Sequence, residues 1–149
     1  MPDYLETTVD KFIFRVATDR RYSPEGAWAL AEGGRVLVGV TDFVQQRSGD
    51  VAFAEVRPPG RTLAVGDEIA LIETIKANVE VPSPVAGTVV KANPALQLAP
   101  EAINQDPYGD GWLAVVEPAD WSRDGAALLD PEAYLEHMKA QAEEEATKP

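Results

Sequence analysis

Cysteine is absent from this chain of 149 residues, and histidine occurs only at position 137. The missing thiols exclude disulfides, thiolate zinc sites and cysteine nucleophiles. A single histidine on an expected surface helix is more often a solvated or core-edge side chain than a catalyst. The composition therefore predicts no catalytic residue and no metal site, and it fits a cytoplasmic protein.

Basic residues are few beside the acidic ones: 13 Lys and Arg stand against 25 Asp and Glu, a formal net charge of −12. Phosphate backbones and anionic lipids repel such a chain, so neither nucleic acid nor a membrane is an expected partner. A basic docking face on another protein is a better candidate. Long hydrophobic runs are also missing, and the first residues are neither basic nor strongly apolar, so no membrane span and no signal peptide are expected.

Hydrophobic residues make up 45% of the chain, enough for one domain with a substantial core. Runs of β-branched and aromatic residues, separated by Gly and Pro turns, predict short strands. Strands are expected at residues 11–17, 27–30, 35–40, 51–56, 69–75, 79–90 and 112–117, short helices at 43–47 and 93–104, and a final helix from Asp130. This pattern predicts a small β-barrel or sandwich with helices at one end.

Lys76 is singled out by its position. It lies in a short polar break, residues 76–78, between the strand-like runs 69–75 and 79–90. A lysine at the tip of a tight hairpin is exposed, fixed in direction and open to modification. Taken alone, the position also fits a solvated turn lysine, which is the commoner fate of a surface lysine. The surrounding sequence decides between a modified lysine and a solvated turn lysine.

The residues around Lys76 resemble a known attachment site. Glu73-Thr-Ile-Lys-Ala77 is similar to the Glu-Ser-Val-Lys-Ala element of lipoyl-bearing H proteins, the carrier subunits of the glycine cleavage system. Further segments match that family in the same order along the chain, at residues 38–43, 49–50, 83–87, 90–93, 106–112 and in the helix after Leu128. The resemblance covers residues 22–142, and the ordered set is more specific than any one segment.

The resemblance implies a fold that is mainly β with short helices. It is a lipoyl/biotinyl-type flattened β-barrel (barrel-sandwich hybrid) over residues 22–142, which include the C-terminal helix. Residues 1–21 form an N-terminal extension with an extra strand, and residues 143–149 form an acidic tail.

The resemblance also implies a cofactor, lipoate, joined to Lys76 by an amide bond. Glu73, Thr74, Ile75 and Ala77 are then the context that a lipoate-attaching enzyme reads. Biotin carriers share the fold but generally place Met on both sides of the lysine, so lipoate is favoured here.

The end of a lipoyl arm is a five-membered disulfide ring. Its S–S torsion cannot reach the preferred value near ±90°, so the ring opens readily and offers two thiols for a group or two electrons. Because this chemistry belongs to the cofactor, the resemblance implies a carrier protein and not an enzyme.

The chain departs from the family where a loaded arm is held. H proteins have a His-Glu-Trp element near the N-terminus; here Trp28 is kept, but Gly26 and Ala27 replace the other two residues. In the family, that Glu, a Ser two residues earlier and an Asp after the lipoyl lysine are implied to hold the amino group of the load. The matching positions are Ala27, Glu25 and Glu80. These three residues and Trp28 are the possible arm contacts.

Ala27 has no charge to offer a buried amine. Glu25 and Glu80 compensate for it in one interpretation, and in the other they are solvated surface acids. The two interpretations have equal support.

These departures and the extra N-terminal strand resemble the H-like lipoate-binding proteins of bacterial sulfur oxidation. We expect that role, with a cytoplasmic heterodisulfide-reductase-like complex as partner. One alternative is the H protein of glycine cleavage, carrying an aminomethyl group among glycine decarboxylase, aminomethyltransferase and dihydrolipoamide dehydrogenase. The other alternative is an unmodified structural relative.

Overall fold

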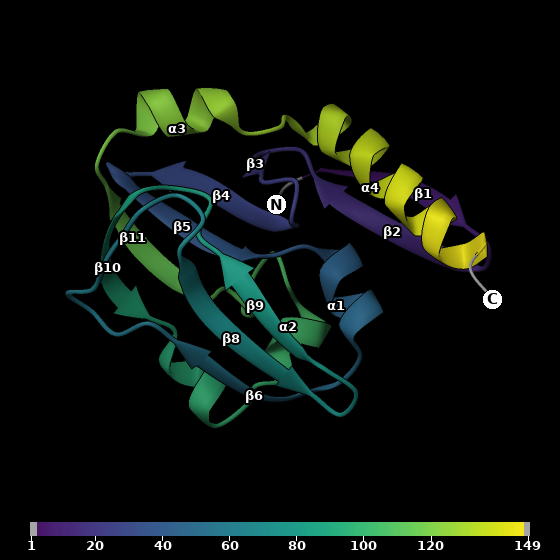
Figure 1. The fold of residues 1–149 in the computed structure, drawn as a ribbon, viewed down its shortest axis with the longest axis horizontal. Coiled ribbons are helices and arrows are strands. Elements are labelled where there is room, and N and C mark those ends of the chain that lie inside the picture. Colours follow the sequence, from purple (N-terminus) through teal and green to yellow (C-terminus); the bar gives the residue numbers. More distant parts are fainter. Residues whose placement is uncertain (1–2, 148–149) are drawn as a thin grey trace.

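Two antiparallel β-sheets packed face to face form the body of the protein in a computed structural model that describes residues 3–147. One sheet has six strands in the order β3-β4-β5-β11-β10-β7, and the other has three in the order β6-β8-β9 (Figure 1). Their bounds are β3 Arg21–Tyr22, β4 Ala27–Glu32, β5 Arg35–Val40, β6 Val51–Val56, β7 Thr62–Leu63, β8 Glu68–Thr74, β9 Asn78–Pro82, β10 Gly87–Ala92 and β11 Ala114–Pro118. The expected flattened, mainly β fold is confirmed.

Alternation of side chains along the strands builds the core between the two sheets. Val36, Val38 and Val40 of β5 are buried in this core, which draws on strands of both sheets. Gly39 lies between them and faces Trp28 on β4, where a Cβ atom would collide with the indole ring. Only glycine lets the ring lie so close to the strand. One face of β5 therefore packs into the core between the sheets, and the opposite face packs against Trp28, which belongs to a second core.

The helices lie outside the sheets. They are α1 Asp42–Ser48, the 3-10 helix η1 Pro94–Gln97, α2 Ala102–Gln105, α3 Trp121–Ala127 and α4 Pro131–Thr147. Thr41 caps α1 by accepting the Val44 N–H at 3.3 Å, and Asp130 accepts the Ala133 N–H at 2.8 Å at the start of α4. None of the helices in residues 3–147 combines the length and the apolar character needed to cross a bilayer.

Helix α3, which connects β11 to α4, is not predicted from the sequence. The acidic segment expected from residue 143 is helical as far as Thr147, where α4 ends. A run of helix-favouring Glu and Ala residues extends the helix beyond its last buried apolar side chain, Ala142.

The N-terminal extension is a β-hairpin of β1 Tyr4–Val9 and β2 Phe12–Ala17, which form a sheet of their own. The expected strand at 11–17 corresponds to β2, but β1 is not predicted, because its threonines and glutamate give it little apolar character. Hydrogen bonds fix β2 to the body: the Tyr108 hydroxyl donates to the Arg15 carbonyl at 2.6 Å, and the Arg15 N–H donates to Asp42 at 3.0 Å. Helix α4 lies along this hairpin (Figure 1).

A stack of two tyrosines joins α4 to the barrel. The rings of Tyr22 and Tyr134 lie 4.6 Å apart and nearly parallel, and both side chains are fully buried. The Tyr134 hydroxyl is 2.9 Å from the Thr41 hydroxyl, and the Tyr22 hydroxyl donates to the Ala17 carbonyl at 2.6 Å. The second core forms around this stack and includes Trp28. The stack therefore connects β2, β3, α1 and α4.

Burial gives this stack a pH dependence. It raises the pKa of Tyr134 to about 12 and raises the pKa of Tyr22 above its usual range. A raised pKa stabilises the fold fully below pH 10. Above that pH the unfolded chain ionises first, so the free energy of unfolding falls by about 1.4 kcal/mol per pH unit for each such tyrosine.

We expect Tyr134→Phe to change stability in two ways. Loss of the Thr41 hydrogen bond should lower the free energy of unfolding by about 1 kcal/mol at pH 8. Between pH 10 and 12 the decline should be shallower than in the wild type, because position 134 no longer ionises in the unfolded chain. Urea unfolding at several pH values measures both effects, with Tyr4→Phe, at an exposed ring, as the control. A wild-type slope in Tyr134→Phe would contradict this account.

Candidate functional site

The β8–β9 hairpin presents Lys76 in a tight turn that Thr74 closes. The Thr74 N–H donates to the Ala77 carbonyl at 2.8 Å. The Thr74 hydroxyl accepts the Ala77 N–H at 3.0 Å and the Lys76 N–H at 3.3 Å, and it donates to the Ala77 carbonyl at 3.1 Å. One threonine side chain therefore satisfies most of the polar backbone of the turn.

Lys76 is exposed at the tip of this turn. Within residues 3–147 no carboxylate pairs with its ammonium. Its side chain lies over Gly49, which follows α1 with a φ of +87°. A Cβ atom at Gly49 would lie only 3.2 Å from Lys76 Cε, so the glycine both ends the helix and leaves space for the lysine.

The other residues around the lysine differ in exposure. Ile75 is 81% exposed and Ala77 is exposed, while Glu73 and Thr74 at the end of β8 are half-buried. An isoleucine this exposed has no packing role in the isolated chain. It offers an apolar contact beside Lys76 to any protein that binds the hairpin.

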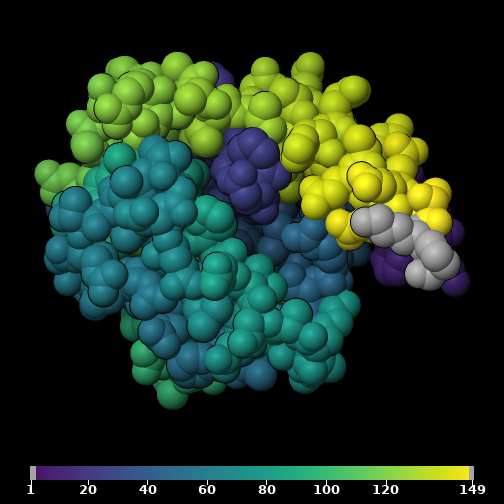
Figure 2. All heavy atoms as spheres, in the orientation of Figure 1, coloured from purple at the N-terminus to yellow at the C-terminus, as the bar shows by residue number. Residues whose placement is uncertain are grey.

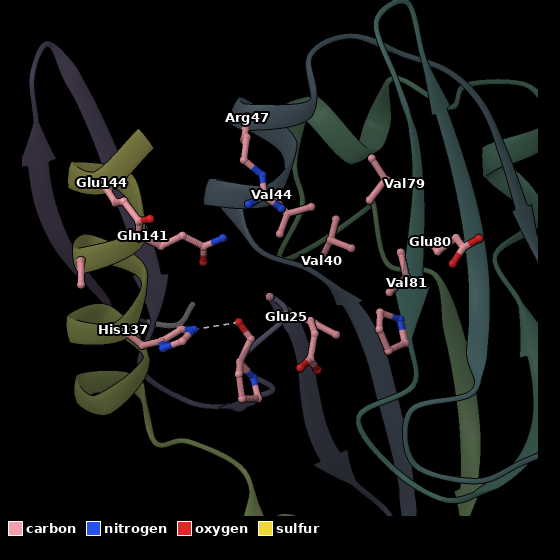
Figure 3. Close-up of a pocket in the computed structure, with 15 residues that line it drawn as sticks. Glu25, Val40, Val44, Arg47, Val79, Glu80, Val81, His137, Gln141 and Glu144 are labelled. Carbon is pink, nitrogen blue, oxygen red and sulfur yellow. Dashed lines mark hydrogen bonds between the residues drawn. The ribbon is translucent and has the colours of Figure 1, made fainter. Parts of the chain in front are cut away.

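A cavity of about 710 Å³ lies between α4, the β3–β4 turn and β9, and we call it the Glu25 cavity. Figure 3 shows Val79 and Val81 on the cavity side of β9, with His137 and Gln141 opposite on α4. In the space-filling view a recess lies between the yellow α4 and the teal β8–β9 segment (Figure 2). The cavity thus begins on the strand that leaves the Lys76 turn.

Charges surround an apolar floor in the Glu25 cavity. Glu25, Glu80 and Glu144 supply carboxylates, and Arg47 is the cation among the lining residues. Arg47 also forms an ion pair with Glu145 at 3.2 Å. The lining carboxylates outnumber the arginine, which favours a positively charged occupant.

The structure brings most of the expected arm contacts together. Glu25, Ala27 and Glu80 all line the Glu25 cavity. Their roles differ, because Glu25 lies between α4 and β9 whereas the Glu80 carboxylate is directed away from Val79 and Val81 (Figure 3). This is the alternation of a β-strand, which places residue 80 on the opposite face from its neighbours.

The expectation that Trp28 contacts an arm is wrong. The side chain is 0% exposed and does not line the cavity. Its indole N–H donates to the Pro107 carbonyl at 3.0 Å, and the Arg20 guanidinium lies 4.5 Å from the ring centroid. Trp28 belongs to the second core because strand alternation turns it away from Ala27.

Sequence reasoning missed the α4 side of the cavity. His137 lies there, and its Nε2 atom is 3.0 Å from the Pro24 carbonyl oxygen. Gln141 follows one helical turn later on the same face of α4. No motif marks these residues, and only the packing of α4 against the barrel brings them near β9. Residues 3–147 contain no group of three or more His, Asp or Glu residues placed to hold a metal ion.

The two-sheet fold with a tight hairpin between β8 and β9 defines the class of lipoyl-type barrel-sandwich domains. A solved structure of this type, the glycine cleavage system H protein from Mycobacterium marinum, superposes with a TM-score of 0.74 at 30% identity, over 81% of this chain and 97% of that one. The family model described as "Glycine cleavage H-protein" matches residues 20–141.

Relatives at the level of sequence agree with this class. A glycine cleavage system H protein from Thermus thermophilus is 42% identical over 127 residues, which are 85% of this chain and 98% of the relative. One from Anaeromyxobacter is 40% identical over 126 residues, again 85% and 98%. The chain belongs to the glycine cleavage H-protein family. These matches favour the glycine cleavage alternative over the expected sulfur-oxidation role, which they do not support.

We expect Thr74→Val to loosen the Lys76 turn without altering the barrel. Valine has nearly the shape of threonine but cannot accept the N–H groups of residues 76 and 77, so the free energy of unfolding should fall by about 1 kcal/mol. Hydrogen exchange at the Ala77 amide should accelerate several-fold. Thr62→Val, at an exposed threonine on β7, is the control and should leave this exchange unchanged. Equal exchange in both variants would contradict the role of Thr74.

Proposed function

We propose that this chain is a lipoyl carrier whose arm is attached to Lys76, and that it acts as the H protein of a glycine cleavage system. The observation that supports this most is the exposed lysine at a hairpin tip held by Thr74, in a chain of the H-protein family. It is a carrier and not an enzyme in isolation.

The residues present suit attachment of lipoate. Acylation needs a reachable amine, and Lys76 is exposed with no paired carboxylate within residues 3–147. Gly49 leaves space beside the side chain. Glu73, Ile75 and Ala77 surround the lysine and are the contacts we assign to the lipoate-attaching enzyme. When attached, the ring supplies two sulfurs that carry a group or two electrons.

The Glu25 cavity suits a cationic load such as an aminomethyl group. Val79 and Val81 provide an apolar wall, and Glu25 provides a carboxylate between that wall and α4. A buried ammonium needs such a partner, since an unpaired charge is costly to desolvate. Glu25 thus takes over the role that Ala27 cannot fill. Glu80 stands at the rim.

The partners of this function are the enzyme that attaches lipoate, glycine decarboxylase, aminomethyltransferase and dihydrolipoamide dehydrogenase. The net charge of −12 favours docking on basic faces of these proteins, and it predicts association that weakens with salt.

One observation keeps sulfur oxidation as a second candidate. Ala27 stands where the family's carboxylate is expected, so the clamp for an amine differs from the family pattern. A carrier of sulfur-derived groups has no amine to hold. Its partner is a heterodisulfide-reductase-like complex.

The attachment site is tested by mass. Incubation with lipoate, ATP and a lipoate-attaching enzyme should add one lipoyl group to the wild type and to Lys139→Ala, in which another exposed lysine is removed. Lys76→Ala should gain nothing, because its amine is missing. Intact-mass measurement reads the result. An unmodified wild type, or a lipoylated Lys76→Ala, would contradict the proposal.

The cargo is tested by exchange of the carboxyl carbon of glycine, using the lipoylated protein with glycine decarboxylase. Glu25→Gln should slow exchange by roughly tenfold, the value of one hydrogen bond to a charged group. Glu80→Gln is the matched control and should have a smaller effect, since its carboxylate is directed away from the cavity.

Two results would count against this account of the cargo. Equal rates in Glu25→Gln and the wild type would exclude Glu25 as the holding residue. Absence of exchange with the lipoylated wild type would reject the glycine cleavage role and favour the sulfur candidate.

A further inference from the structure

A second cavity opens beside Lys76, and we call it the hairpin pocket. Its volume is about 270 Å³, just below the usual range for ligand sites. Lys76 itself lines it, next to Phe43 and Arg47 of α1. Phe12 and Phe14 of β2, the end of β1 and the last turns of α4 also contribute to the wall. The pocket is therefore a site with three phenylalanines in its wall that begins at the proposed attachment point.

The walls of the hairpin pocket are firmly held. Phe14 packs edge-on against Phe43, with 5.3 Å between the ring centroids. The Gln46 amide donates to the Ile13 carbonyl at 2.9 Å, which ties β2 to α1. On α4, Glu145 forms the ion pair with Arg47. The pocket is preformed, so its walls need little reordering to accept an occupant.

Much of this pocket lies outside the part of the chain that defines the family. The family model covers residues 20–141. The contributions of β1 and β2 precede that range, and Ala142, Glu145 and Ala146 follow it. The two ends of the chain thus meet at the pocket and build a feature that the barrel alone does not have.

Phe12 leaves apolar surface exposed in the wall of the hairpin pocket. Its ring is 54% exposed although it faces the pocket side of β2, together with the buried Phe14. A lipoyl arm on Lys76 is a chain of methylenes ending in a neutral disulfide ring, and it starts within the pocket lining. Methylenes gain from leaving water, and sulfur makes favourable contacts with aromatic rings.

We propose that the hairpin pocket is a docking site for the oxidised, uncharged end of the lipoyl arm of this same chain. The proposal rests on the attachment of lipoate to Lys76 proposed above. Acylation replaces the ammonium at the pocket mouth with a neutral amide, which suits an apolar site. Docking then shields the ring from solvent reductants between visits to partner proteins.

The placement of carboxylates separates this site from the Glu25 cavity. The hairpin pocket surrounds its apolar floor with Asp10, Gln46, Arg47 and Glu145, and Arg47 and Glu145 are paired with each other. In the Glu25 cavity, Glu25 lies between the valines of β9 and α4, where its carboxylate can pair with a cation. A neutral ring therefore suits the hairpin pocket, and a cationic load is better matched by the Glu25 cavity.

The test uses the lipoylated full chain and two readouts other than activity. The first is the rate at which a water-soluble phosphine reduces the ring. Phe12→Ser should speed reduction by roughly threefold to tenfold, because the pocket loses a phenyl wall. Ile13→Ser is the matched control. Residue 13 is 56% exposed and adjacent, but it lines a different cavity, so reduction should stay at the wild-type rate.

The second readout is NMR on the unaltered protein, which does not depend on the folding of a variant. Nuclear Overhauser effects from the arm methylenes to the rings of Phe12 and Phe14 and to the Ala146 methyl are expected. Lipoylation confirmed by mass, with no such effects and equal reduction rates in the three proteins, would overturn the pocket proposal and leave the carrier function intact. Phe12→Ser that impairs partner binding while its arm is reduced at the wild-type rate would mean that a partner covers the pocket, and would also overturn it.

Discussion

The stacking of Tyr22 on Tyr134 is the contact on which the rest of the arrangement depends. The barrel needs no such contact to form its own core, but α4 has no other buried aromatic to hold it among the described residues. Because the stack is also bonded to Thr41 and to the Ala17 carbonyl, it sets the position of α4 relative to α1 and β2 together. Both cavities beside the Lys76 hairpin use α4 as a wall. The placement of one helix therefore determines what the hairpin faces.

The two cavities divide the surroundings of Lys76 by polarity. Arg47 lines both of them and marks their boundary. On one side β9 and the β3–β4 turn offer valines and carboxylates, and on the other the N-terminal hairpin offers phenylalanines. On the function proposed above, an arm whose end changes between neutral and charged forms would meet a different environment on each side.

Much of the barrel follows from the sequence, because Gly and Pro turns and β-branched runs are local signals. Lys76 and its motif are also local, and the hydroxyl at position 74 is part of that motif. The N-terminal hairpin is not readable in this way, since β1 is polar and depends on long-range contacts with β2, α4 and Tyr108. The α4 residues that line the Glu25 cavity, such as His137, are placed there by long-range packing and carry no motif. Trp28 is next to Ala27 in the sequence, but its side chain points to the opposite side of β4 and does not line the cavity.

Peptide mapping of the protein isolated from the cells that produce it tests the central claim most directly. The account predicts that the peptide containing Lys76 carries a lipoyl group in place of one amine hydrogen, and that peptides containing the other lysines do not. An unmodified Lys76 in cells that lipoylate other proteins, or a lipoyl group on a different lysine, would contradict the account.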